Sequence, residues 1–343
     1  MRRVAGRGQA AVAVGIAGTA KNTGKTTSLR ALMDECGRRG WGVCVTGIGF
    51  DGEDLDNVTR LPKPRIPCRD GVLVATALDC LGAGDAEVAV EHETGIETAL
   101  GRVCVGTVRR AGFVVIAGPN KSSDLSRLLR TIRARPEPPA VILVDGAFGR
   151  IAPMGVCDGL FIATGAARNP VIGPLATETR SMVKVFDIPK VGPRTGGGDD
   201  IEVRGVASPA ALHRLAETLG PGLSGRSVIV SSPTCLLASG DPPAIEEAME
   251  RISSLGGSLR VRRRPALLGV TVNPFFPVRL SEGRYETGRV DEDELLSAFR
   301  MRIGRPVWDV VAEGAAGMAD AVESLASGMG GCSLEGEDGG FVE

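Results

Sequence analysis

Residues that commonly build metal and redox sites are scarce in this sequence. Aromatic residues make up 3% of the 343 residues, and there are two histidines. Eight cysteines are present, none of them in a Cys-x-x-Cys pair: Cys36, Cys44, Cys68, Cys80, Cys104, Cys157, Cys235 and Cys332. A zinc site built from cysteine and histidine is therefore not expected. The cysteines favour buried, reduced thiols in a cytoplasmic protein.

Strong net charge and long apolar runs are also missing. Forty basic and 41 acidic residues give a formal net charge of -1, so the sequence has no electrostatic footprint for nucleic acid. No apolar run approaches the ~18 residues of a transmembrane helix. The apolar run near the N-terminus leads directly into a polar loop, which predicts a core strand and not a signal peptide. We expect neither nucleic-acid nor membrane partners.

The most informative stretch is a strand, a glycine-edged loop and a helix within residues 11–40. An apolar run of strand length ends at Gly18, and Gly24-Lys25-Thr26-Thr27 precedes a helical pattern with Leu29 and Leu32 on one face and Gly40 as its stop. This context favours a phosphate-binding loop over a chance turn. Backbone N–H groups and the positive end of the helix would face a polyphosphate. The predicted nucleotide-binding residues are Gly18, Thr19, Lys21, Asn22, Thr23, Gly24, Lys25, Thr26 and Thr27.

Residue types in this loop suggest individual roles. Lys25 would reach the β- and γ-phosphates, Thr26 would ligate Mg²⁺ and Thr27 would lie near the α-phosphate. The usual first glycine of such a loop falls on Thr19, and the glycine stands one residue earlier, at Gly18. Lys21 would contact phosphate or be solvated. The Gly-Thr-x-x-x-x-Gly-Lys-Thr spacing resembles dethiobiotin synthetase and its relatives in the signal-recognition and MinD group of P-loop proteins.

Two aspartates are candidates for the Mg²⁺ site. Asp145 follows an entirely apolar run, residues 140–144, which is typical of a central parallel strand. A carboxylate at that position holds Mg²⁺ in P-loop enzymes, so Asp145 is predicted as a catalytic and metal residue together with Lys25. Asp51 lies in the acidic loop just after the second predicted strand, residues 41–49, and ligands of open α/β sheets collect at such strand ends. The alternative for each aspartate is that it has no metal role and occurs there because Asp and Gly favour turns.

The remaining pattern predicts an α/β fold: a parallel-sheet P-loop domain with a β-rich insertion, followed by a second, smaller α/β domain. We expect the nucleotide-binding domain over 1–194, with the insertion at 71–119, and the C-terminal α/β domain over 195–314. Residues 315–343 are expected to be a weakly ordered tail rich in glycine and acid. Asn120-Lys-Ser-Ser-Asp124 has the wrong spacing for guanine recognition, and Ser122 or Ser123 is expected to cap a helix.

Several stretches together resemble one family. They are residues 18–27, 61–66 (Leu-Pro-Lys-Pro-Arg-Ile), 118–121 (Gly-Pro-Asn-Lys), 144–147 (Val-Asp-Gly-Ala), 163–166 (Ala-Thr-Gly-Ala) and 270–274 (Val-Thr-Val-Asn-Pro). They look like the ATPase reactivase protein encoded beside lysine 5,6-aminomutase, over most of residues 10–312. The last stretch is followed by Phe275-Phe276-Pro277, where the resemblance would lead us to expect Ser-Pro.

That resemblance implies a function, cofactors and partners. The protein would use ATP and Mg²⁺ to help an adenosylcobalamin- and pyridoxal-phosphate-dependent aminomutase recover after its cobalamin is inactivated. The partner would be lysine 5,6-aminomutase or a relative, and a second reactivase subunit would fit beside it. Lys25, Thr26 and Asp145 carry over as nucleotide and metal residues. Two alternatives stay open: a ligase like dethiobiotin synthetase acting on a small carboxylate or amine, and a regulatory protein that holds nucleotide without turnover.

Overall fold

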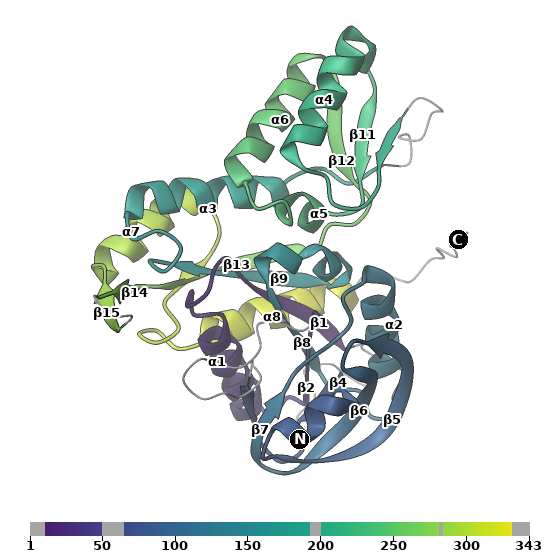
Figure 1. The fold of residues 1–343 in the computed structure, drawn as a ribbon, viewed down its shortest axis with the longest axis vertical. Coiled ribbons are helices and arrows are strands. Elements are labelled where there is room, and N and C mark those ends of the chain that lie inside the picture. The colour runs from purple at the N-terminus through teal and green to yellow at the C-terminus, as the bar shows by residue number, and fades with distance from the viewer. Residues whose placement is uncertain (1–10, 50–64, 193–199, 281–283, 331–343) are drawn as a thin grey trace.

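A nine-stranded sheet is the largest feature of the computed structural model, which describes residues 11–49, 65–192, 200–280 and 284–330 (Figure 1). The strand order is β16-β13-β9-β1-β8-β2-β4-β6-β5. Neighbours are parallel from β16 to β4, and β6 and β5 continue the sheet antiparallel. The strands are β1 (Val12–Gly18), β2 (Val43–Gly47), β4 (Leu73–Ala77), β5 (Glu87–Thr98), β6 (Gly101–Arg110), β8 (Val141–Ala147), β9 (Gly159–Gly165), β13 (Ala266–Asn273) and β16 (Val307–Trp308). The predicted α/β fold with a mostly parallel sheet is confirmed.

Helices cover both faces of the central strands, which is why β1 and β9 are apolar and buried along their whole length. Successive side chains of a strand point to opposite faces. Val12, Val14 and Ile16 belong to the core shared with α1 (Lys25–Arg38) and α8 (Ala316–Gly330). Ala13 and Ala17 belong to the other core, shared with α2 (Ser122–Arg133), α3 (Ile172–Phe186) and α7 (Glu292–Ile303).

A second, three-stranded parallel sheet lies at the top of Figure 1, in the order β10-β11-β12. Its strands are β10 (Ile201–Val203), β11 (Ser227–Val230) and β12 (Ser258–Val261), and its helices are α4 (Pro209–Leu219), α5 (Pro233–Leu237) and α6 (Pro242–Ser254). Side chains cap the starts of α4 and α6. Ser208 caps α4 by accepting a hydrogen bond from the Ala211 N–H, and Asp241 caps α6 by accepting one from Ala244.

The sheet topology differs from the expected division at 194/195. β13 and β16 fall within the predicted second domain, residues 195–314, yet both join the large sheet. β13 pairs in parallel with β9 from Ala266↔Gly159 to Asn273↔Gly165, so the chain leaves the large sheet after α3 and returns to it. A buried apolar strand fits either parallel sheet, and its pattern alone does not choose between them. The expected boundary itself falls in residues 193–199, outside the described residues.

The insertion between β2 and α2 is rich in strands, as predicted. β4, β6 and β5 extend the large sheet, while β3 (Arg65–Cys68) and β7 (Gly112–Val115) form an antiparallel pair. A further antiparallel pair, β14 (Phe275–Arg279) and β15 (Tyr285–Arg289), follows directly after β13. Short 3-10 helices complete the described elements: η1 (Leu78–Ala83), η2 (Phe148–Arg150), η3 (Ala152–Val156) and η4 (Gly220–Leu223).

Two local expectations were wrong. The stretch after residue 315 is not weakly ordered up to residue 330: α8 packs against α1 and the sheet, and its Met318, Ala319 and Val322 are fully buried. Residues 331–343 lie outside the described part. The structure also places the N-cap of α2 at Lys121, with no side-chain cap, so Ser122 and Ser123 already belong to the first turn.

Burial of the thiols agrees with the expectation for the cysteines. Seven of the eight lie in described residues, and all seven are buried and unbridged. Burial raises the pKa of the Cys44 and Cys68 thiols to about 12. Thiolates are the reactive form, so these groups are inert packing residues at neutral pH.

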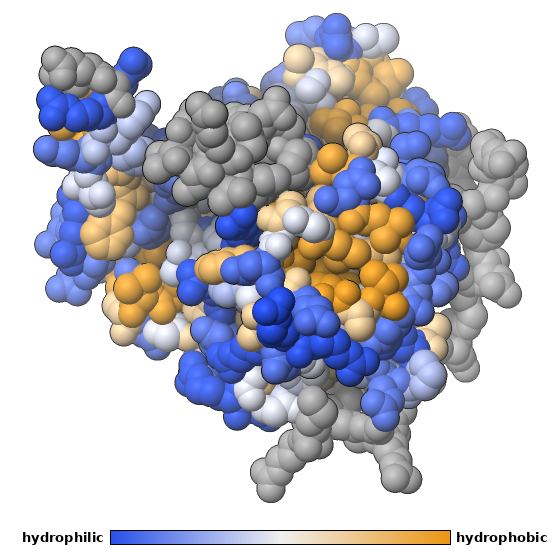
Figure 2. All heavy atoms as spheres, turned by 60° about the horizontal axis from the view of Figure 1, so that its bottom comes forward, coloured by the Kyte–Doolittle hydropathy of each residue, from blue (hydrophilic) through white to orange (hydrophobic). Residues whose placement is uncertain are grey.

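Figure 2 shows hydrophilic residues over most of one face, with hydrophobic residues gathered near its middle. The exposed large hydrophobic side chains of the described residues are spread over different elements: Val90, Phe113, Val171, Val206, Val278, Tyr285, Met301, Val311 and Met329. Within the same residues, no helix has the length and apolar character needed to cross a membrane.

Candidate functional site

The connection between β1 and α1 forms the predicted loop. β1 ends at Gly18 and α1 begins at Lys25, after the N-cap residue Gly24. Gly24 has a φ of 82°, and Asn22, with a φ of 62°, is the only non-glycine residue of the described chain at positive φ. Gly24 has no side chain to accept from the first N–H groups of α1. These donors are therefore left for a ligand or solvent.

All nine predicted nucleotide-binding residues line one cavity of about 520 Å³. Its lining comprises residues 18–27 together with Ala147, Phe148, Gly149 and Asn273. The cavity thus combines the loop with the end of β8 and the end of β13. A volume of this size is typical of small-ligand sites.

Lys25 and Asp145 form an ion pair at this site. The Lys25 Nζ lies 2.6 Å from the Asp145 Oδ2, with side-chain exposures of 19% and 4%. Strand register explains the contact, because β8 pairs with β1 so that Asp145 stands opposite Ile16, two residues before the loop. Thr26 follows Lys25 directly and lines the cavity. The structure therefore brings Lys25 into contact with Asp145 and places Thr26 in the lining of the cavity, whereas Asp51 lies outside the described residues.

The position of the first glycine follows from the path of Lys25. A Cβ added to Gly18 would lie 3.0 Å from the Lys25 Cβ and 3.1 Å from its Cδ. The lysine stem therefore passes directly over the end of β1, and a side chain at position 18 would crowd it. Thr19, at the usual glycine position, is instead held by its hydroxyl, which donates to the Thr164 Oγ1 at 2.9 Å.

The donor set fits a magnesium–polyphosphate ligand. The Asp145 Oδ1 is buried and has no hydrogen-bond partner among the described residues, although its other oxygen pairs with Lys25. A buried carboxylate oxygen without a partner is costly and is normally satisfied by a water or an ion. Lys25, Thr26 and the loop N–H groups supply the positive charge, the hydroxyl and the donors that phosphates and Mg²⁺ need.

Sequence reasoning missed Asn273 as a site residue. Its Nδ2 donates to the Asn22 carbonyl at 2.7 Å, and its side chain lines the cavity. The nearest available signal was its stretch, residues 270–274, which we used only as a mark of resemblance.

Arg168, in the β9–α3 connection, was also missed. It donates from Nη1 to the Thr19 carbonyl at 2.7 Å and pairs with Glu178. It follows the Ala-Thr-Gly-Ala stretch, residues 163–166, by two residues. Nothing in the sequence around it points to a role beside the phosphate loop.

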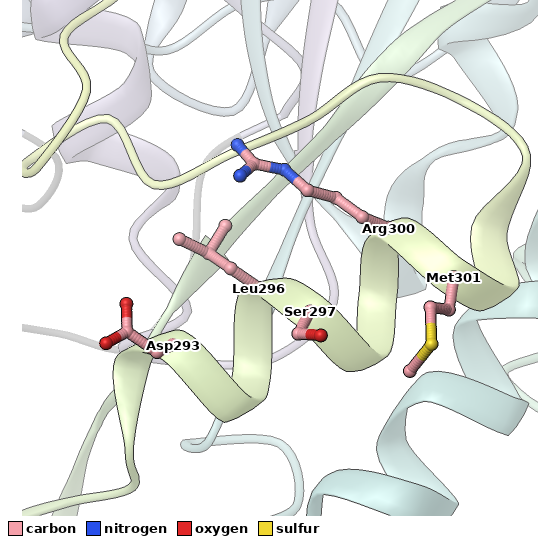
Figure 3. A pocket seen from close by; sticks show the side chains of 5 residues that line it. All are labelled: Asp293, Leu296, Ser297, Arg300 and Met301. Carbon is pink, nitrogen blue, oxygen red and sulfur yellow. The ribbon is translucent and has the colours of Figure 1, made fainter.

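A second hollow lies on α7 (Figure 3). Its volume is about 440 Å³, and its lining side chains all come from that helix: Asp293, Leu296, Ser297, Arg300 and Met301. Arg300 already pairs with Glu313 at 2.6 Å. This hollow presents a compensated charge and no loop donors, so it is a weaker ligand site than the loop cavity. The described residues contain no group of three or more histidine, cysteine, aspartate or glutamate side chains placed to hold a metal.

Comparisons with known proteins give distant likenesses. No protein-family model matches the chain. A curated protein, a probable DNA ligase of Anaeromyxobacter sp. (strain K), is 26% identical over 222 residues, which cover 59% of this chain and 39% of the ligase, so the chain spans well under half of that protein's length.

Solved structures with some likeness include a ParA protein and a cell-division protein complex. The pNOB8 ParA structure aligns at 14% identity with a TM-score of 0.29, covering 63% of this chain and 74% of that one. The MinC:MinD cell-division complex of Aquifex aeolicus aligns at 12% identity with a TM-score of 0.27, covering 96% of this chain and 100% of the other. Likenesses at this level do not place the chain in a family, and the argument for its function rests on the site itself.

Proposed function

We propose that the chain is an ATP- and Mg²⁺-dependent P-loop ATPase that reactivates an adenosylcobalamin- and pyridoxal-phosphate-dependent aminomutase, such as lysine 5,6-aminomutase. The observation that carries the ATPase half is the Lys25–Asp145 pair beside a cavity lined by the whole loop. The aminomutase half is supported by the six stretches that resemble the reactivase family.

Each residue has a task in this proposal. The loop N–H groups and the start of α1 hold the phosphates, and Lys25 leaves Asp145 to bind them. Thr26 and Asp145 would hold Mg²⁺, and the ion would supply neutralisation of the charge that develops on the phosphates during hydrolysis. The Asp145 carboxylate would then face Mg²⁺ in place of the Lys25 ammonium, and its buried, unpartnered Oδ1 is available for that role. The chemistry needs little from the protein beyond positioning and charge.

Turnover measurements test this proposal. Purified protein should hydrolyse ATP in the presence of Mg²⁺, and an aminomutase whose cobalamin has been inactivated should recover activity when both protein and ATP are added. Lys25→Ala serves as the control without loop chemistry. Absence of both turnover and a nucleotide-dependent complex with the aminomutase removes the proposal.

A second candidate is a ligase like dethiobiotin synthetase, which phosphorylates a small carboxylate or carbamate. The observation that favours it is the turn after Asp145, because Ala147, Phe148 and Gly149 line the same cavity as the loop. A ligase should stay nearly silent without its substrate. ATP hydrolysis assayed against a panel of diamino and dicarboxylic acids separates the two: stimulation by one acid favours the ligase, and turnover without any acid favours the ATPase.

A further inference from the structure

We propose that Arg168 is a positioning residue of the phosphate loop: with Glu178 as its anchor on α3, it fixes the orientation of the Thr19–Ala20 peptide for polyphosphate binding. The inference rests on the proposed nucleotide site and names a residue outside the loop on which that site depends. Arg168 belongs to the β9–α3 connection and does not line the cavity itself.

Arg168 is held from two sides. Its Nε donates to the Glu178 Oε2 at 2.8 Å, and its Nη2 donates to the Glu178 Oε1. The pair is therefore bidentate, which fixes the plane of the guanidinium as well as its position. The third nitrogen, Nη1, donates to the Thr19 carbonyl at 2.7 Å. A rigid fork on α3 thus ends in a hydrogen bond to the first residue of the loop.

Among the hydrogen bonds of Thr19 in the described residues, the one from Arg168 bears on the peptide that follows it. The Thr19 N–H donates to the Ala163 carbonyl at 2.9 Å, and the Thr19 hydroxyl donates to the Thr164 Oγ1. Both groups precede the ψ torsion of Thr19, so neither sets the direction of its carbonyl. In a trans peptide the carbonyl and the next N–H point in opposite directions. Fixing the Thr19 carbonyl on Arg168 therefore aims the N–H of Ala20, which lines the cavity, away from Arg168.

The charge balance favours positioning over direct contact with phosphate. The Glu178 carboxylate occupies one edge of the guanidinium, formed by Nε and Nη2, and neutralises the Arg168 charge. The Arg168 guanidinium also lies 5.8 Å from the centre of the Phe148 ring, in the turn after Asp145. Arg168 therefore contacts the loop, the turn after Asp145 and α3 at once, and it acts through Thr19.

Partial burial strengthens the Arg168–Glu178 ion pair. The side chains of Arg168 and Glu178 are 17% and 24% exposed, so water and salt screen the pair less than an ordinary surface pair. Loss of a hydrogen bond from a charged donor should weaken polyphosphate binding roughly ten-fold.

The test compares Arg168→Gln, Arg168→Lys and Glu178→Gln with a matched control, Arg305→Gln. Arg305 pairs with Asp187, the residue that ends α3, the helix that also carries Glu178. Arg305 does not line the cavity. Calorimetry with Mg·ATP and with inorganic triphosphate gives the dissociation constant and the stoichiometry for each variant. Inorganic triphosphate has no base or ribose, so its binding reports on the phosphate loop alone. A general loss of structure would instead lower the stoichiometry of both ligands.

Arg168→Gln should raise the dissociation constants of ATP and of inorganic triphosphate by the same factor, about ten-fold, at full stoichiometry. Arg168→Lys should recover part of the loss, Glu178→Gln should lose an intermediate amount, and Arg305→Gln should match the wild type. Unchanged constants in Arg168→Gln, or a reduced stoichiometry at an unchanged constant, overturn the role of Arg168. A wild-type protein that gives no heat with ATP overturns the proposed function itself, and the two failures are thus distinguishable.

Discussion

Replacing Asp145 by asparagine separates the two partners that the proposed site assigns to this carboxylate. At 2.6 Å, the Lys25–Asp145 attraction is about 6 kcal/mol for an effective dielectric constant of ~20. Desolvation of a carboxylate that is 4% exposed offsets much of this. The net contribution of such a charged hydrogen bond is on the order of 1.5–3 kcal/mol. Asp145→Asn should therefore lower the free energy of unfolding by about that amount.

The same change should affect nucleotide binding in opposite directions with and without magnesium. A polyphosphate must take Lys25 from Asp145, so the neutral amide lowers that cost and should tighten Mg²⁺-free ATP binding by about ten-fold, which corresponds to ~1.4 kcal/mol. The gain in affinity that Mg²⁺ gives the wild type should disappear, since the carboxylate that holds the ion is gone.

Calorimetric titration with ATP in EDTA and in Mg²⁺ measures both effects. Lys25→Met is the control, because it should weaken ATP binding under both conditions. Weaker Mg²⁺-free binding by Asp145→Asn, at full stoichiometry, would refute the reasoning that Lys25 must leave Asp145. An undiminished response to Mg²⁺ would refute the metal role of Asp145.

Other perturbations test the loop, the C-terminal helix and the link to the small sheet. Gly24→Ala should lower the free energy of unfolding by about 1–2 kcal/mol in urea denaturation, because a φ of 82° strains any other residue and the new Cβ would come 3.2 Å from the Cβ of Asn273; an unchanged value contradicts the loop geometry. Met318→Ala, in a fully buried position of α8, should cost about 2–5 kcal/mol in the same assay, and a change below 1 kcal/mol would mean that α8 is not packed as described. Burial raises the pKa of Glu246, but hydrogen bonds, above all from Lys184, outweigh it and hold the pKa below its ordinary value of 4.5. Because a lowered folded-state pKa stabilises the fold above the unfolded-state pKa and the effect is lost as the pH falls through the folded-state value, Glu246→Gln should be less stable than the wild type at pH 7 and equal to it in acid; a difference that persists below pH ~3 contradicts this.

The phosphate loop was predictable because its signal is local. A strand-length apolar run, a glycine-edged loop and an amphipathic helix follow one another within residues 11–40, and each forms as expected. Asp145 was predictable for a related reason. Neighbouring parallel strands end at the same edge of a sheet, so a carboxylate at the end of a central strand falls beside a loop that leaves the next one.

The remaining parts of the site depend on sheet order, which strand patterns do not encode. Asn273 reaches the loop across 251 residues of sequence because β13 lies two strands from β1, on the far side of β9. Arg168 reaches Thr19 because β9 is the direct neighbour of β1. A buried apolar strand such as β13 has the same sequence pattern in either sheet, which explains why it was assigned to the C-terminal α/β domain, residues 195–314.

The helix α8 was not predicted because its amphipathic pattern is weak. Met318, Ala319, Val322 and Ala326 have helical spacing and are buried, but the helix is rich in alanine, glycine and serine and borders an acidic stretch. Small residues pack well against α1 while giving little amphipathic contrast. The packing of α8 is therefore a tertiary feature that local propensity understates.

The most direct measurement of the central claim is a crystal structure of the protein with Mg²⁺ and a non-hydrolysable ATP analogue. The account predicts a polyphosphate in the cavity lined by residues 18–27, with the Lys25 Nζ moved from Asp145 to phosphate oxygens and the metal beside Thr26 and Asp145. A structure with the analogue bound elsewhere, or with the Lys25–Asp145 pair intact beside bound phosphates, would contradict it.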